Sequence, residues 1–170
     1  MHRLMVLYLV DGYLSYDRPC HVMAETIIVR ECRHGQVRVQ FGNIIRVDGD
    51  IMVIPANNRL AGREGLDERM QLAAGDELRA RCTEIAVERR KEGKQPCGVG
   101  EAVSTSGYNL PAENLVHVVA PDCRRPNQDN FRRELLVNSY NAMFDEISKI
   151  EPRKTVVTPP LGMDVFAYPH

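Results

Sequence analysis

The chain has 170 residues, of which 44% are hydrophobic and 26% charged, a composition typical of one globular domain with a substantial core. Its formal net charge of -1 gives no reason to expect binding along nucleic acid, which needs an excess of Lys and Arg. Five widely spaced cysteines without a C-x-x-C pair argue against a disulfide framework and a zinc ribbon, so we expect a cytoplasmic protein without a metal site.

The first third of the chain predicts β structure. An apolar run at the N-terminus is too short to span a membrane and predicts a buried strand. Two later runs flank a turn at Arg33-His34-Gly35 and predict a hairpin. A further apolar run, just before a loop, predicts a second buried strand. The strands expected in this part are residues 4–10, 26–30, 37–41, 44–45 and 51–54.

The rest of the chain alternates between helical and extended patterns. Apolar residues at three- and four-residue spacing predict helical structure over 67–91, broken in two by Gly75, and a helix over 131–150. Further strands are expected at residues 101–105, 115–120 and 155–158. This alternation favours an α/β fold, and the hairpin near the start implies a mixed sheet with antiparallel strands at one edge.

The segment from Pro55 to Asp67 is the strongest local sign of function. It follows a buried strand, carries paired Asn residues and glycines, and ends on an Asp where a helical pattern opens. Such a layout suits an anion, because backbone N–H groups at a helix N-terminus are exposed. The same residues have a plainer interpretation: Asn57 and Asn58 as turn residues, and Asp67 as a helix cap or first-turn carboxylate.

Seven short segments are informative when they are taken together and in order. They are Gly42–Ile45, Asp50–Asn58, Leu60–Asp67, Ala73–Gly75, Cys97–Val103, Gly107–Pro111 and Val116–Pro121. This set resembles the macrodomain family, whose pattern runs GDIT, DAIVNAAN, LLGGGGVD, AAG, CPTGEAV, GYNLP and IHTVGP. The similarity extends over roughly residues 36–169, and seven ordered matches are far more specific than any one of them.

The resemblance implies a three-layer α/β/α sandwich that binds ADP-ribose or an ADP-ribosylated protein in a surface cleft, without metal or cofactor. Many family members remove ADP-ribose from proteins or hydrolyse related esters, and others only bind. By the same resemblance, Asn57 orients the distal ribose, and Asp67 positions or activates water. His117 matches a family His on a strand, and we expect it to serve core packing or a structural hydrogen bond, not catalysis. The ligand-binding residues that it implies are Asn43, Ile44, Asn57, Gly62, Arg63, Gly65, Leu66, Gly162, Met163, Asp164, Val165 and Phe166.

Three positions depart from the family pattern within the expected phosphate loops. Arg63 and Glu64 replace two glycines, and Asp164 falls where the family has another. Glycine allows backbone conformations and close approaches that side chains block, so we expect a narrower cleft or a different loop path. The two carboxylates add negative charge near a diphosphate, which Arg63 could offset. The alternative function is therefore a non-catalytic macrodomain that acts as an interaction or assembly module.

The two ends of the chain also differ from the family pattern. The sequence stops at His170, where the family continues with a helix and a strand, and about 35 residues precede the first matched motif. We expect a single domain over residues 1–170, with an N-terminal extension of edge strands over 1–35 and the core over 36–170. An uncovered sheet edge favours association into a homo-oligomer. Binding of nucleic acid through basic pairs such as Arg124-Arg125 is the weaker possibility.

Overall fold

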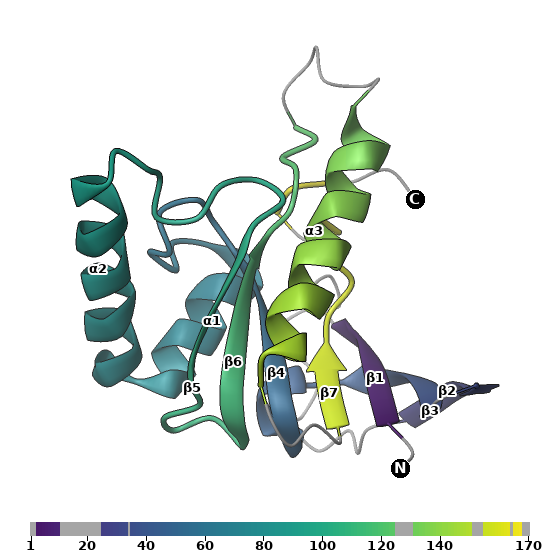
Figure 1. The fold of residues 1–170 in the computed structure, drawn as a ribbon. Helices are drawn as coiled ribbons and strands as arrows, with labels where there is room; N and C mark the ends of the chain where they lie inside the picture. The colour runs from purple at the N-terminus through teal and green to yellow at the C-terminus, as the bar shows by residue number, and fades with distance from the viewer. Residues whose placement is uncertain are drawn as a thin grey trace.

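Seven strands form one mixed sheet at the centre of the molecule (Figure 1). The computed structural model describes residues 3–10, 25–33, 35–124, 131–150, 155–163 and 165–167. The strands are β1 (Arg3–Val10), β2 (Glu25–Cys32), β3 (Gly35–Gly42), β4 (Gly49–Ala56), β5 (Ala102–Ser106), β6 (Ala112–Val119) and β7 (Thr155–Thr158). They lie in the order β2-β3-β1-β7-β4-β6-β5.

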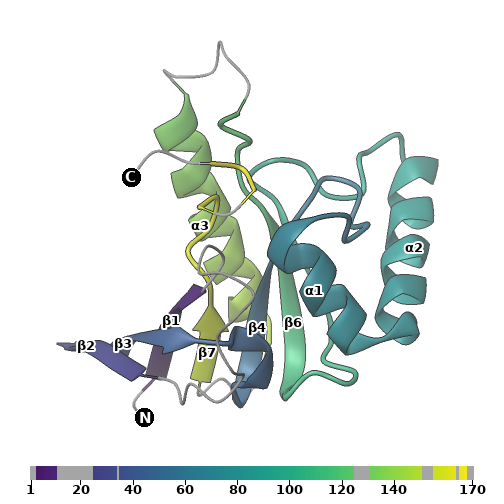
Figure 2. The ribbon, with the colours of Figure 1, turned by 180° about the vertical axis from the view of Figure 1, so that it is seen from behind.

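Helices cover both faces of one half of the sheet. They are α1 (Gly65–Ala74), α2 (Asp76–Lys91) and α3 (Arg132–Ser148). Figures 1 and 2 show α1 and α2 on one face and α3 on the other. Alternate residues of β4 supply both cores: Met52 and Ile54 belong to the cluster with α1 and α2, and Ile51 and Val53 to the cluster with α3. This period of two is typical of a strand buried on both faces, and the three-layer expectation is confirmed.

The N-terminal strands are placed only partly as expected. β2 and β3 form the expected antiparallel hairpin, and a register shift between Thr26 and Ile28 marks a bulge. β1, however, lies inside the sheet, parallel to both β3 and β7, and not at its edge. The outer strand is β2, whose Ile27, Ile28 and Val29 are 41–53% exposed. In the described part of the chain, this edge of the sheet is therefore an eight-residue strand with three exposed apolar side chains.

Two expectations about local structure were wrong or incomplete. Residues 44–45 are not extended but belong to a short 3-10 helix, Ile44–Arg46. Asn43 caps this turn, because its Oδ1 accepts a hydrogen bond from the backbone N–H of Ile45 at 3.2 Å. The sheet also carries a second antiparallel pair, β5 and β6, at the edge opposite β2.

Two glycines decide the path of the chain between elements. Gly75 has φ 94° and separates α1 from α2, which confirms the expected break. Gly107 opens the turn between β5 and β6, where a Cβ would lie 1.6 Å from the carbonyl oxygen of Ala112. Only glycine allows the backbone to approach so closely.

Two further observations concern the class of protein. Among the described residues, no helix is long and apolar enough to cross a membrane. Four of the five cysteines lie in the described part of the chain, and all four are free thiols.

Candidate functional site

The candidate site lies where three neighbouring parallel strands end. β7, β4 and β6 are adjacent and run in the same direction. Asn57 follows β4, the loop from Pro159 follows β7, and residues 120–124 follow β6. In open α/β sheets, ligands bind in the crevice outside the carboxyl ends of such strands.

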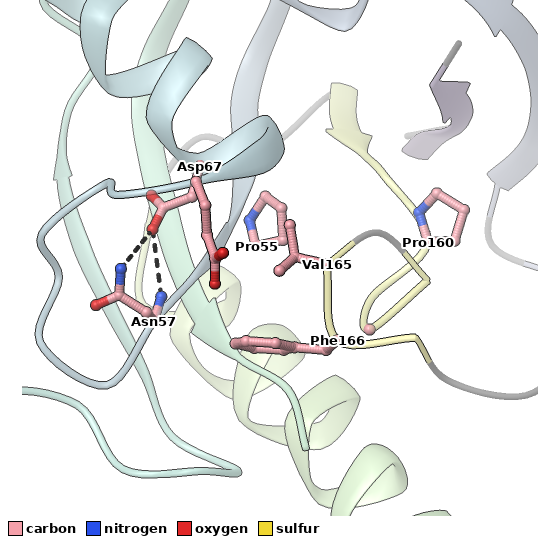
Figure 3. Close-up of a pocket in the computed structure, with 8 residues that line it drawn as sticks. Pro55, Asn57, Asp67, Pro160, Val165 and Phe166 are labelled. Carbon is pink, nitrogen blue, oxygen red and sulfur yellow. Dashed lines mark hydrogen bonds between the residues drawn. The ribbon is translucent and has the colours of Figure 1, made fainter. Parts of the chain in front are cut away.

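A pocket opens at this edge, with about 400 Å³ of empty space including its mouth. Its lining combines apolar side chains with an amide and two carboxylates (Figure 3). The lining residues are Pro55, Asn57, Glu64, Asp67, Pro160, Gly162, Val165 and Phe166. Of the sequence-predicted residues, the structure thus brings Asn57, Asp67, Gly162, Val165 and Phe166 together around one space.

Asn57 and Asp67 are joined by two hydrogen bonds, drawn in Figure 3. The backbone N–H and the side-chain Nδ2 of Asn57 donate to Asp67 Oδ2 at 3.3 and 3.1 Å. Asn57 Oδ1 accepts from the backbone N–H groups of Arg59 at 2.9 Å and Ala61 at 3.3 Å. The amide is therefore held at both ends, and its orientation follows from its partners, since Nδ2 faces a carboxylate and Oδ1 faces backbone donors.

Burial changes the acidity of Asp67. Its side chain lies in the first turn of α1 and the residue is only 5% exposed. Desolvation raises the pKa of this carboxyl from 3.8 to about 6, although hydrogen bonds from Asn57, Gln71 and the Gly62 backbone act in the opposite direction. A carboxylate with such a pKa is suited to accept a proton near neutral pH.

The loop before α1 accommodates its two non-glycine residues without backbone strain. Positive φ values occur at Gly62 (52°) and Gly65 (65°), both of which are still glycine. Glu64 is extended, with φ -157°, and Arg63 is not among the residues with positive φ. The expected change of loop path is therefore not required by backbone conformation, and what the substitutions alter is the charge and size of the pocket wall.

Arg124 also reaches this site, although the sequence singles it out only as part of the basic pair Arg124-Arg125. Its guanidinium contacts two residues of the pocket lining: Glu64 at 3.5 Å and the ring of Phe166, whose centroid is 5.7 Å away. Glu64 is therefore paired with Arg124, and the expected contact of Arg63 with a phosphate stays a prediction. The available signal was position, because Arg124 follows β6 at the same sheet edge.

Several predicted site residues lie outside the pocket lining. Asn43 is exposed at the start of the 3-10 helix, and the side chains of Ile44 and Leu66 are buried in the core with α1 and α2. The lining residues also do not include Gly62, Arg63, Gly65 or Met163, and Asp164 lies outside the described residues.

His117 is a core residue, as expected. It is fully buried on β6, and its Nε2 lies 3.1 Å from Thr105 Oγ1. This hydroxyl also donates to the carbonyl of Ser106 at 3.2 Å, and Nδ1 of His117 has no hydrogen-bond partner among the described residues. Desolvation lowers the pKa of His117 from 6.5 to about 4.

Comparisons with known proteins agree with this architecture. A profile of the Macro domain family matches residues 53–170. The chain is 32% identical over 134 residues to a Macro domain-containing protein of Mesorhizobium japonicum, covering 79% of this chain and 69% of that protein. It is 30% identical over 136 residues to an O-acetyl-ADP-ribose deacetylase of Escherichia fergusonii, covering 79% and 71%.

Solved structures show the same fold. The Oceanobacillus iheyensis macrodomain with ADP superimposes with a TM-score of 0.76 at 25% identity, covering 86% of this chain and 74% of that one. The Trypanosoma brucei macrodomain in complex with ADP-ribose gives a TM-score of 0.55 at 25% identity, covering 74% of this chain and 47% of that one.

Proposed function

Since the chain belongs to the Macro domain family, we propose that it binds ADP-ribose in the pocket beside Asn57 and hydrolyses ADP-ribose from modified proteins. The observation that supports this most directly is the bonded pair of Asn57 and Asp67 in the pocket lining. The names of relatives and neighbours support the ligand class: an O-acetyl-ADP-ribose deacetylase and structures with ADP and ADP-ribose.

In the proposed reaction, water attacks the anomeric carbon of the distal ribose. A carbon–oxygen bond forms there, and the bond to the modified side chain breaks with its electron pair, which takes up a proton. Asn57 orients the sugar, and Asp67 accepts the proton of the attacking water, for which its raised pKa is suited. The loops over residues 62–66 and 162–166 hold the diphosphate.

Binding is tested by calorimetry with ADP-ribose. We expect heat of binding with the wild-type chain, and no heat at millimolar ligand would refute the proposal. Because ADP-ribose would bind the folded chain and not the unfolded one, a large excess of ligand should also raise the melting temperature by several degrees.

The catalytic role is tested with Asp67→Ala, and Glu68→Ala serves as the control because Glu68 is an exposed carboxylate in the same helical turn. We expect Asp67→Ala to abolish turnover of an ADP-ribosylated protein, with little change in ADP-ribose affinity. Glu68→Ala should keep full turnover. Unchanged turnover of Asp67→Ala would reject the role, and a matching loss of affinity would instead indicate that Asp67 only positions Asn57.

The alternative function, a non-catalytic interaction module, is favoured by one observation: Glu64 places a second carboxylate in the pocket lining. Self-association that depends on concentration, together with the absence of thermal stabilisation by ADP-ribose, would support it against the first proposal.

A further inference from the structure

The guanidinium of Arg124 is fixed on one side by a two-point contact with Asp122. Arg124 Nε donates to Asp122 Oδ1 at 2.8 Å, and Nη2 donates to Oδ2 at 2.7 Å. The backbone N–H of Arg124 donates to the same Oδ1 at 3.1 Å. Such fork-to-fork pairing sets the plane of the guanidinium as well as its distance, so the remaining nitrogen, Nη1, has a defined direction.

Nη1 faces the pocket wall, but its contact there is loose. It lies 3.5 Å from Glu64 Oε1, and the two side chains are 44% and 58% exposed. Exposed ion pairs of this kind contribute little, whereas the Asp122 contact is short and bidentate. Arg124 also lies over the ring of Phe166, at 5.7 Å from the centroid. Through these two weaker contacts, the guanidinium connects the loop before α1, which holds Glu64, with the loop after β7, which holds Phe166.

The charges of the pocket lining indicate which ligand the weak contacts of Arg124 suit. The lining includes two carboxylates, Glu64 and Asp67, which disfavour an anionic ligand. Arg124 places a cationic group in contact with that lining. A phosphate group carries a full negative charge and can accept a short hydrogen bond from Nη1. It is therefore a better partner for Nη1 than the Glu64 carboxylate, which lies 3.5 Å away.

We propose that Arg124 binds the diphosphate of the ligand through Nη1, in exchange for Glu64, which acts as a built-in competitor for this cation. This inference rests on the proposed function, since it assigns a residue to the anionic part of ADP-ribose. Asp122 keeps the guanidinium in place during the exchange. Arg124 is thus a binding residue outside the glycine loops, and Glu64 sets how tightly the anion is held.

The test measures ADP-ribose affinity by calorimetry for Arg124→Gln, Glu64→Gln and the control Arg90→Gln, an exposed arginine on α2. We expect Arg124→Gln to weaken binding about tenfold, the lower end for a lost hydrogen bond to a charged group. Glu64→Gln should tighten binding several-fold, roughly the effect expected for removing one nearby like charge. Arg90→Gln should match the wild type, and Arg124→Lys, which keeps the charge without the fork, should lose less than Arg124→Gln.

High salt separates ligand binding from a merely structural role. At about 1 M NaCl the Debye length falls to about 3 Å, so the difference between wild type and Arg124→Gln should shrink if Arg124 acts as a partly exposed charge. A loss of affinity that persists in high salt would indicate a misplaced loop and overturn the inference.

The two proposals fail in different ways. Binding of ADP-ribose by the wild type that Arg124→Gln leaves unchanged would overturn the role of Arg124 and leave the proposed function standing. Glu64→Gln that weakens binding would overturn the role of Glu64 as competitor. Absence of binding by the wild-type chain would overturn both proposals.

Discussion

Asp67 and His117 are two buried titratable side chains, and they should oppose each other in the pH dependence of stability. Asp67 has a pKa of about 6 in the folded chain, against 3.8 as the ordinary value. His117 has a pKa of about 4, against 6.5. Both shifts come first from desolvation, which penalises the charged form of each group, but the charged form is the deprotonated one for Asp and the protonated one for His.

The signs follow from proton counts. Between pH 3.8 and about 6, folded Asp67 holds a proton that the unfolded chain has released, so the free energy of unfolding falls as pH rises through this window. Between pH 4 and 6.5, unfolded His117 holds a proton that the folded chain lacks, so the free energy of unfolding rises with pH. Each shift of a little over two pKa units corresponds to about 3 kcal/mol, and the two contributions nearly cancel.

Single substitutions should reveal the two hidden slopes. Asp67→Asn removes the falling contribution, so its free energy of unfolding should gain about 3 kcal/mol relative to wild type between pH 4 and pH 7. His117→Gln keeps a side chain that can hydrogen-bond Thr105 and removes the rising contribution, so its free energy of unfolding should fall by about 3 kcal/mol relative to wild type over the same range. The chain has no Trp, and urea unfolding followed by circular dichroism is the suitable assay.

Differences from wild type are the quantity to compare, because the lowered pKa values of Glu92, Glu101 and Glu146 then cancel. If the free energy of unfolding of Asp67→Asn runs parallel to that of wild type from pH 4 to pH 7, the reasoning is refuted. It is also refuted if the difference from wild type changes with pH in the same direction for Asp67→Asn and His117→Gln.

Three other predictions concern packing and the sheet edge. Gly107→Ala should destabilise the chain by about 3 kcal/mol in urea unfolding, because its Cβ would meet a β6 carbonyl oxygen, whereas Gly93→Ala, which meets nothing within 4 Å, should cost only about 1 kcal/mol from its positive φ. Met143→Ala removes a fully buried side chain and should cost about 2–5 kcal/mol by the same assay, while Met163→Ala, 41% exposed, should stay within about 0.5 kcal/mol. We expect the exposed edge of β2 to mediate self-association, and Ile28→Lys should then reduce it in sedimentation velocity, since a lysine blunts an exposed edge; unchanged association would exclude β2 as the contact.

The elements that sequence alone could predict are those set by local periodicity. The helices on either side of Gly75, the long helix α3 and the hairpin of β2 and β3 all follow from apolar spacing and turn residues. The 3-10 turn after Asn43 was missed because one side-chain cap decides it against two β-branched residues. The interior place of β1 was missed because parallel pairing joins segments far apart in the chain, and apolar spacing does not encode the partner.

The residues of the candidate site also differ in whether local sequence could predict them. The ten-residue spacing of Asn57 and Asp67 and their motifs allowed both to be predicted, and the structure adds the two hydrogen bonds between them. Arg124 could not be assigned from its neighbours in sequence, because its partner Glu64 lies in a different loop and meets it only at the shared sheet edge. The balance of charges around the pocket therefore becomes visible only when the folded structure brings these two loops together.

A crystal structure of the chain grown with ADP-ribose tests the central claim most directly. The account predicts electron density for the ligand in the pocket, with its distal ribose beside Asn57 and Phe166 and its anomeric carbon facing Asp67. An empty pocket at saturating ADP-ribose, or a ligand bound away from Asn57 and Asp67, would contradict it.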